Sequence, residues 1–274
     1  MLRSKGMIYN TGETSEQLKE RYNPEESLLR KGQLRMLDML QYIHKVCKDL
    51  KVQYRLDGGN VLGAVRHGGF IPWDDDVDVA MERKDWKKLI KYLEKNPHPQ
   101  YKIQTHRTDP GYMGAWAVLR DVKSEYIVNT PEHNIRKYRG LQVDIFPFDR
   151  GNIFFLQRIA IKLDCKLIRF WFGKSNFMAS IGYHLTYGIL FPMFRLFNVF
   201  GDKKKFSNSY GTGWFKQQIP LDVYKPEKEI FFEGIKFAGP AKPDEYLKIL
   251  YGDYMKLPPV EKRDHHRATY KIWD

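Results

Sequence analysis

The apolar residues of the first 150 positions switch between helical and strand-like spacing. The longest helical pattern predicts an amphipathic helix over residues 25–50, with Leu28, Leu29, Leu34, Leu37, Leu40, Ile43, Val46 and Leu50 facing a core. Shorter patterns predict helices over residues 60–66 and 85–95, and strands over residues 52–56, 77–81, 101–105, 115–122 and 141–146. Helices and strands alternate before strands follow one another, so we expect an α+β fold, a mixed sheet core with flanking helices.

The patterns divide the chain into four parts. Residues 1–24 are polar and predict a flexible N-terminal arm ending at Pro24, residues 25–150 the mixed-sheet core, residues 151–215 an added helical amphipathic region, and residues 216–274 a C-terminal segment packing on the core. In the last part, Glu233-Gly234 supplies the turn of a hairpin over residues 230–238. A helix is expected over residues 244–250.

The segment from residue 153 to residue 172 combines a basic stripe with many apolar residues. Arg158, Lys162, Lys166 and Arg169 recur at helical spacing, within an arc of roughly 80°. The segment carries too many charges to span a bilayer. Two readings remain: a helix lying on an anionic membrane surface, or an ordinary core helix with a solvated basic face. The more apolar residues 185–200 are interrupted by Pro192 and Arg195.

Composition narrows the class of protein. The 274 residues are 42% hydrophobic and 29% charged, as in a globular protein of one large domain or one domain with an appendage. The net charge of +13 predicts an anionic partner, which leaves nucleic acid, an anionic membrane surface and phosphorylated substrates. Nucleic acid is the least favoured because the chain carries no recognisable RNA-binding module.

Cysteine content and the start of the chain indicate the compartment. Cys47 and Cys165 lie in predicted helices without a CxxC neighbour, so we expect two buried, reduced thiols rather than a disulfide or a zinc site. Residues 1–20 contain no apolar run of signal-peptide length. These features predict a cytoplasmic protein.

Four aspartates in five positions mark the most informative stretch. Asp76 and Asp78 share one face of the predicted strand, with Cβ atoms roughly 6–7 Å apart, and Asp74 has the same parity. Carboxylates so placed repel one another unless a cation lies among them, and oxygen ligands favour Mg²⁺ or Mn²⁺. Asp75 has the opposite parity and is expected to face solvent or cap a loop. The alternative is a solvated acidic loop without a metal.

Asp144 is the candidate for a further metal ligand. It is the only acid in residues 141–146, an otherwise apolar strand. A lone buried carboxylate needs a partner, and a two-metal site needs a carboxylate from a second strand. The alternative is a hydrogen-bonded core aspartate.

Gly58 and Gly59 open a predicted helix whose first N–H groups are suited to a phosphate. Arg66 and Arg120 are candidates to clamp phosphate oxygens, with exposed surface arginines as the equal alternative. His67 is expected to be a loop residue rather than a base.

At this point the motifs identify a family. Asp57-Gly58-Gly59, Leu62-Gly63, Arg66 and the run from Gly69 to Asp78 closely resemble the LicD family, a branch of the nucleotidyltransferase superfamily with a DNA-polymerase-beta-like core. Residues 143–149 resemble its second acidic motif. Residues 251–255, with Pro258-Pro259, Arg263 and His266, resemble its closing motif.

The resemblance implies a transferase that moves phosphocholine from CDP-choline to a sugar hydroxyl of a cell-surface glycan, while relatives move other phospho-alcohols such as ribitol phosphate. It also implies that Asp76, Asp78 and Asp144 hold the metal, with Asp74 as a further ligand. A lipid-linked glycan acceptor would place the protein at the inner face of the membrane. If choline is transferred, Trp73, Tyr112 and Trp116 are candidates to contact its quaternary ammonium.

Two alternatives stay open. A nucleotidyltransferase using a nucleoside triphosphate on RNA or a small molecule would use the same carboxylates. A catalytically inactive scaffold that binds glycan or membrane would not need them. The roles of Arg263, His265 and His266 are open between tail packing and donor contact.

Overall fold

A mixed sheet forms the centre of the computed structural model, which describes residues 8–212, 217–263 and 269–273. Within these residues the sheet has seven strands: β1 (Arg55–Leu56), β2 (Asp78–Glu82), β3 (Tyr101–Gln104), β4 (Ala117–Asp121), β6 (Gln142–Arg150), β7 (Lys205–Asn208) and β8 (Ile219–Pro220). The order is β1-β2-β6-β4-β3, and β7 joins β6 to β8. The β2–β6 pair is parallel and the other pairs are antiparallel, so the predicted mixed α+β core is confirmed.

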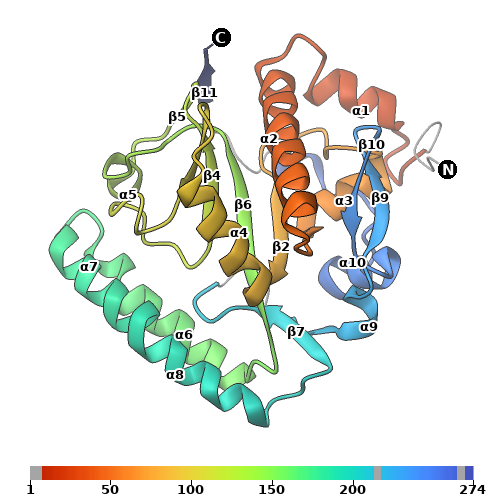
Figure 1. Ribbon diagram of the computed structural model, residues 1–274. Helices are drawn as coiled ribbons and strands as arrows, with labels where there is room; N and C mark the ends of the chain where they lie inside the picture. Colours follow the sequence, from red (N-terminus) through yellow and green to blue (C-terminus); the bar gives the residue numbers. More distant parts are fainter. Residues whose placement is uncertain (1–7, 213–216, 264–268, 274) are drawn as a thin grey trace.

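Helices cover the sheet (Figure 1). They are α1 (Ser15–Tyr22), α2 (Leu28–Leu50), α3 (Gly58–His67), α4 (Arg83–Lys95), α5 (Pro131–Asn134), α6 (Phe154–Leu167), α7 (Asn176–Tyr183), α8 (Phe191–Leu196), α9 (Leu221–Tyr224) and α10 (Pro243–Tyr251). Helices α2 and α4 pack on β6, and α10 packs on α3 beside β2. The elements that carry the aspartates are thereby held from both sides.

Helix α2 confirms the longest sequence pattern. The Ser27 side chain caps its N-terminus by accepting from the N–H of Arg30, and the helix ends where Lys51 turns left-handed. Most of its apolar face is buried, with Leu40 and Ile43 fully covered, but Leu28 and Leu34 near its start, also expected to face the core, are exposed. This helix therefore anchors the sheet through apolar burial, as predicted.

The N-terminal segment is a correction. Residues 1–24 were expected to form a flexible arm, but Thr14 and Gln17 form a capping box that starts helix α1. Leu18 is fully buried and the Tyr9 hydroxyl donates to the carbonyl of Arg66. Two anchoring apolar residues in a polar stretch are too few to create a periodic signal. Residues 1–7 of the predicted arm lie outside the described residues.

The C-terminal segment contains the predicted hairpin. Strands β9 (Lys228–Phe232) and β10 (Ile235–Gly239) pair through a turn in which Glu233 and Gly234 both have positive φ, which matches the twist of a tight hairpin. A further pair was not predicted, in which β5 (Ser124–Ile127) meets β11 (Thr269–Ile272). It joins segments about 140 positions apart, which no local pattern reveals.

Residues 153–200 form a separate layer of helices, called the helical unit below, at the lower left of Figure 1. Helix α6 leads through a 3₁₀ turn (η1, Arg169–Trp171) to α7, a π-helical segment (η2, His184–Leu190), α8 and a last 3₁₀ turn (η3, Phe197–Phe200). Among the described residues, no helix is long and apolar enough to cross a membrane. Both cysteines are free, and Cys47 is buried as predicted, but Cys165 is exposed on α6, which corrects the prediction for that thiol.

Candidate active site

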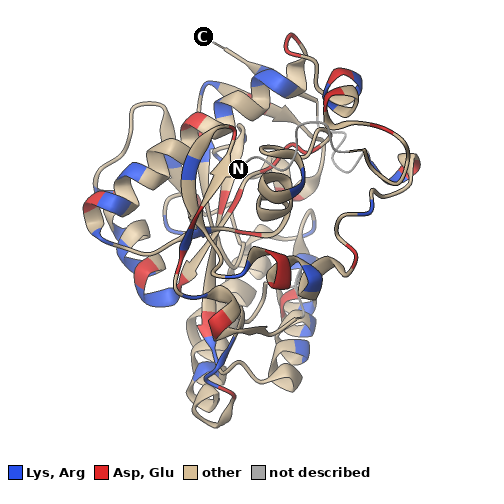
Figure 2. Cartoon of the chain, turned by 90° about the vertical axis from the view of Figure 1, so that its right-hand side faces the viewer, with Lys and Arg blue, Asp and Glu red and all other residues tan. Residues whose placement is uncertain are grey.

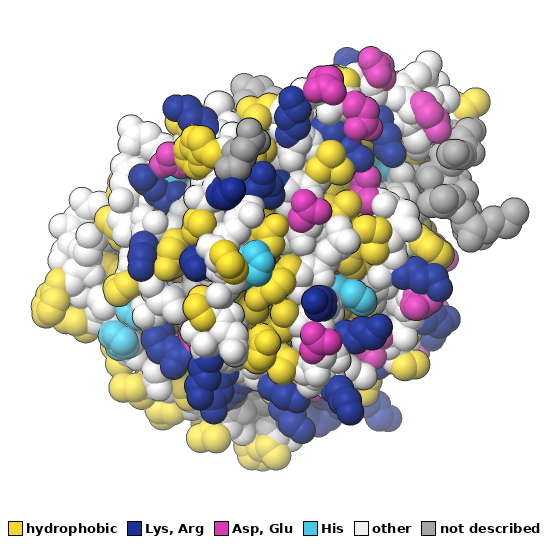
Figure 3. Space-filling model, turned by 45° about the horizontal axis from the view of Figure 1, so that its top comes forward, with side chains coloured by type: hydrophobic (Ala, Val, Ile, Leu, Met, Phe, Trp, Pro, Cys, Tyr) yellow, Lys and Arg dark blue, Asp and Glu magenta, His cyan; other side chains and the backbone are white. Residues whose placement is uncertain are grey.

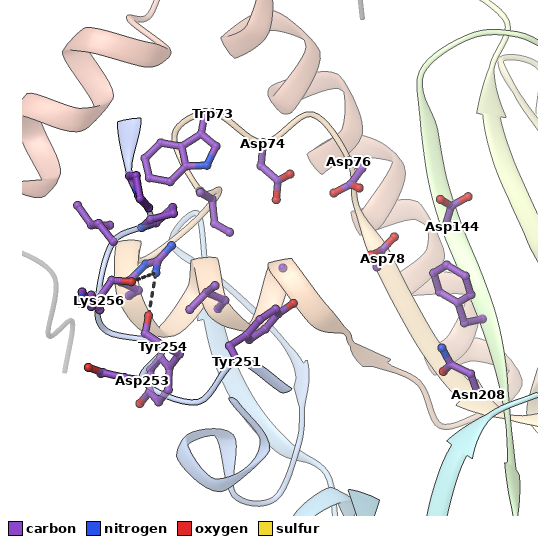
Figure 4. Close-up of a pocket in the computed structure, with 18 of the residues that line it drawn as sticks. Trp73, Asp74, Asp76, Asp78, Asp144, Asn208, Tyr251, Asp253, Tyr254 and Lys256 are labelled. Carbon is purple, nitrogen blue, oxygen red and sulfur yellow. Dashed lines mark hydrogen bonds between the residues drawn. The ribbon is translucent and has the colours of Figure 1, made fainter. Parts of the chain in front are cut away.

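The two acidic motifs meet on adjacent parallel strands. Asp78 of β2 is directly in register with Asp144 of β6, so both side chains leave the same face of the sheet. Both line a cavity of about 750 Å³, together with Asp74 and Asp76. Figure 4 shows the four carboxylates along one wall, with residues of the C-terminal segment opposite. The predicted convergence of the two motifs is therefore present.

The predicted alternation of side chains is also present. Asp74, Asp76 and Asp78 are half-buried, whereas Val77 and Val79 are fully buried. The strand begins at Asp78, so Asp76 lies in the extended segment that precedes it.

Asp75 is a correction. We expected it to face solvent or cap a loop, but it is buried and lines a second cavity. Its backbone carbonyl accepts a hydrogen bond from Tyr126 at 3.0 Å. Asp75 does have the opposite parity to Asp74 and Asp76, as predicted. The side to which it points is covered by β5 instead of being open to solvent.

Burial and mutual repulsion dominate the electrostatics of these carboxylates. Burial, and then the charges of Asp76 and Asp144, raise the pKa of Asp78 well above its usual value. Burial raises the pKa of Asp144 to about 6, against the opposing effects of Arg120 and of a 3.0 Å hydrogen bond from the Trp116 indole. Gln142 donates to the other Asp144 oxygen at 3.0 Å. A cation placed among these groups would relieve their repulsion.

The donor set suits a hard divalent ion. All four candidate ligands are carboxylates, the oxygen ligands that Mg²⁺ and Mn²⁺ prefer. Within the described ranges, no three Asp, Glu, His or Cys side chains already close around one point as in a preformed metal centre. The fit therefore rests on the shared face, the oxygen chemistry and the raised pKa values.

The glycine turn supports the acids directly. Gly58 begins α3, and its N–H donates to the Tyr246 hydroxyl at 3.1 Å, so this donor is already engaged. Gly59 lines the large cavity, and a Cβ there would lie 3.1 Å from an Asp74 oxygen. In the same helix the Asn60 side chain accepts from the N–H of Asp78 at 2.5 Å. Sequence reasoning missed this anchor for β2.

The two predicted phosphate clamps are buried rather than exposed. Arg66 lines the large cavity and donates to the carbonyl of Tyr254 at 2.8 Å, and burial lowers its pKa to about 10. Arg120 donates to Gln104 at 2.8 Å and to the carbonyl of Gly140 at 2.9 Å. It lines two smaller cavities rather than the large one. His67 was expected in a loop but is the last residue of α3, where it is buried beside Arg66 and accepts a hydrogen bond from it.

The three aromatic residues proposed to contact choline do not all line the same cavity. Trp73 and Trp116 line the large cavity, whereas Tyr112 is buried and lines a small neighbouring one. Sequence reasoning gave no site role to several other residues that line the large cavity: Gln142, Asn208, Tyr251, Asp253 and Lys256. Three of them belong to residues 251–259, where the closing motif was the available signal.

Arg263 has a structural position. It is fully buried, donates to the carbonyl of Pro258 at 2.9 Å and pairs with Glu13 at 2.7 Å. It thus fixes the loop of the closing motif to the N-terminal segment, which favours tail packing over donor contact. His265 and His266 lie outside the described residues.

A second cavity adjoins the first. It has about 410 Å³ and a polar lining that includes Arg120, Thr130, Glu132, His133 and Arg136. Asp76 and Gln142 line both cavities. Asp76 therefore stands at the boundary between two spaces, where two molecules bound side by side would meet.

Comparison with known proteins gives consistent relatives. The family model described as "LicD/FKTN/FKRP, nucleotidyltransferase domain" matches residues 51–177. Lipopolysaccharide cholinephosphotransferase LicD of Haemophilus influenzae is 30% identical over 255 residues, which cover 87% of this chain and 96% of that protein. Ribitol 5-phosphate transferase FKRP of Homo sapiens is 47% identical over 45 residues, 16% of this chain and 9% of that protein.

Proposed function

The chain belongs to the LicD family, and from this premise we propose that it transfers a phospho-alcohol, specifically phosphocholine, from a CDP-activated donor to a sugar hydroxyl of a cell-surface glycan or its lipid-linked precursor, releasing CMP. The name of the Haemophilus influenzae relative supports lipopolysaccharide as the glycan. The observation that carries the proposal is the register of Asp78 with Asp144 at the wall of a cavity large enough for a nucleotide.

The four carboxylates would hold Mg²⁺ or Mn²⁺. Asp78 and Asp144 supply ligands from the sheet, and Asp76 and Asp74 from the segment before β2. Such an ion, when bound, neutralises and orients the phosphates of the donor. The protein's own side chains bind the donor and the acceptor and accept the hydroxyl proton.

We place the donor in the large cavity. Lys256 supplies a positive charge on the wall opposite the carboxylates. Trp73 and Trp116 supply aromatic faces of the kind that hold a quaternary ammonium. The acceptor fits the adjoining polar cavity, whose Thr130 and Glu132 suit sugar hydroxyls. The two substrates then meet beside Asp76.

The reaction follows from this arrangement. The acceptor hydroxyl attacks the phosphorus that carries the alcohol, a new oxygen–phosphorus bond forms, and the bond to CMP breaks with its electron pair leaving on CMP. The hydroxyl proton passes to a carboxylate. We assign this step to Asp144, whose buried carboxylate lies in register with Asp78 at the wall of the cavity.

Thermal shift with a panel of donors tests the proposal. CDP-choline, CDP-ribitol, CDP-glycerol and CDP-ethanolamine are each added with Mg²⁺. We expect the largest rise in Tm for CDP-choline and none for it without the metal, because a ligand stabilises the state that binds it. Stabilisation by nucleoside triphosphates but by no CDP-alcohol would instead favour the nucleotidyltransferase alternative. A chain that binds none of them would be the inactive scaffold.

A further inference from the structure

The outer edge of the helical unit carries a continuous stripe of exposed apolar side chains. Residues 176–200 run through α7, η2, α8 and η3 as one rod. Every fourth residue along it is apolar and exposed: Phe177, Ile181, Leu185, Ile189, Met193 and Phe197, called the apolar stripe below. Phe177 is 74% exposed and Phe200, at the end of the rod, 81%. Such a contiguous patch marks a surface that contacts something apolar.

The stripe is not an unfinished core. The opposite face of the rod is already packed, with Ala179, Thr186 and Phe191 fully buried against the rest of the unit. At Gly182 the contact with α6 is so close that a Cβ would lie 1.7 Å from the carbonyl oxygen of Leu167. The apolar stripe therefore stays exposed although the opposite face of the rod is packed against the rest of the unit.

The helical unit and the residues that follow it are rich in positive charge. Residues 153–205 contain nine Lys or Arg but two Asp and no Glu. One of the two acids, Asp164, is buried and paired with Arg169 at 2.6 Å. Arg158, Lys162 and Lys166 are exposed on α6, and Lys203, Lys204 and Lys205 follow the end of the rod.

The figures agree with this combination of charge and apolar surface. Figure 2 shows blue segments on its lower helices, and Figure 3 shows Lys and Arg side chains above hydrophobic ones at its lower rim. An apolar face with a basic border matches the interface of an anionic bilayer, with acyl chains below and phosphate headgroups around them. If a second copy of the chain packed on this face instead, the Lys and Arg side chains of the two copies would repel each other.

We propose that the helical unit docks on an anionic lipid bilayer, with the apolar stripe at the acyl boundary and the basic residues of α6 and of residues 203–205 at the headgroups. The chain then lies on the membrane without crossing it. The docking also has a consequence for the site. Arg169 and Phe172 of the unit line a small cavity together with Trp116 and Asp144. A lipid-linked acceptor would therefore be held beside the carboxylates, an extension that rests on the proposed function.

Flotation with vesicles tests the docking. The full chain is mixed with vesicles of phosphatidylcholine alone or with 30% phosphatidylglycerol, at low and high salt. We expect flotation with the anionic vesicles at low salt and several-fold less with neutral vesicles or at high salt. Failure to float with anionic vesicles at low salt overturns the proposal.

Two sets of variants sharpen this test. Ile181→Glu with Phe197→Glu removes apolar contact, and Lys162→Gln with Lys166→Gln removes charge; each pair should lower the bound fraction about tenfold or more. Val122→Glu with Val260→Glu is the matched control, because both valines are exposed elsewhere. Variants that float like the unmodified chain contradict the proposal. So does a dimer in solution that the glutamate pair dissociates while flotation is unchanged.

The donor-induced thermal shift distinguishes membrane docking from donor binding. The same variants should keep the donor-induced thermal shift, because their side chains lie outside the large cavity. Loss of flotation with the shift retained supports docking. A missing shift in the unmodified chain would instead count against the proposed function alone.

Discussion

The sheet centre and the helical unit distribute polar and apolar groups in opposite ways. At β2 and β6, carboxylates are drawn inward among apolar strands, and Asp144 is only 8% exposed. In the helical unit, Phe177 and its neighbours are turned outward into water. Both arrangements cost free energy in the isolated chain, because burial penalises charge and water penalises exposed apolar surface. A fold retains such departures where a ligand offsets them.

The comparison teaches which kind of partner each region suits. In the proposals above, a divalent ion supplies positive charge to the carboxylates, and a bilayer supplies a low-dielectric neighbour to the apolar stripe. If the two regions serve these separate partners, each can be disabled while the other still works.

The largest effect is expected from the acids. Asp78→Asn or Asp144→Asn should lower the turnover number by about 10²- to 10³-fold, because a ligand is lost from the ion that would neutralise and orient the donor phosphates. Steady-state CMP release measures this, and vesicle flotation should not change. Asp49→Asn is the control, since Asp49 is exposed on α2 and lines none of the cavities described above. Near-normal turnover in both single variants would remove these residues from the mechanism.

Two glycine substitutions, one in each region, test whether the sheet centre and the helical unit can be disabled separately. In Gly63→Ala the new Cβ would lie 2.3 Å from the carbonyl oxygen of Gly69, in the loop leading to the acids; in Gly182→Ala it would meet Leu167. Each change should destabilise by about 3 kcal/mol, the upper range for overpacking, because backbone atoms yield poorly. Chemical denaturation measures the loss.

The functional consequences of the two glycine changes should differ. Gly63→Ala should weaken the donor-induced thermal shift, and Gly182→Ala should weaken flotation. If both variants lose both properties equally, the two regions are not separable and the comparison fails.

The smallest effect is expected for stability, at the place where the sheet connects to the helical unit. Asp149 at the end of β6 pairs with Arg83 at 2.7 Å and accepts from Ser209 at 2.7 Å, just after β7 returns from the helical unit. Hydrogen bonds and charge from Arg83 outweigh burial and lower the pKa of Asp149. Asp149→Asn should cost about 1–2 kcal/mol at pH 7, between the values for exposed and buried ion pairs.

The pH dependence of that difference follows from its sign. A carboxyl whose folded pKa is lowered stabilises the protein above its unfolded value of about 3.9, and this stabilisation is lost as the pH falls through the folded value. Denaturation midpoints at several pH values should therefore show the unmodified chain and Asp149→Asn converging in acid. A constant difference would show that the ion pair is not its source.

Much of the site could be predicted, because its signals are local. Strand parity places Asp74, Asp76 and Asp78 on one side, and the lone acid in β6 marks Asp144. The register that brings Asp78 beside Asp144 is a long-range property that local spacing does not contain. The site-residue assignments themselves stay predictions.

What the sequence did not reveal depends on tertiary contacts. Arg66 and Arg120 look like surface arginines in sequence, yet backbone carbonyls from distant segments accept their hydrogen bonds and allow their burial. Tyr251 and Lys256 enter the cavity because α10 packs on α3. The π-helical segment within the rod, His184–Leu190, has no recognisable sequence signal.

One product analysis tests the central claim most directly. CDP-choline is incubated with the protein, Mg²⁺ and lipopolysaccharide, and ³¹P NMR identifies the phosphorus compounds formed. Attack at the phosphorus that bears choline predicts free CMP and a phosphodiester on the glycan. Free phosphocholine, with the cytidylyl group on the glycan, would show attack at the other phosphorus and contradict the account.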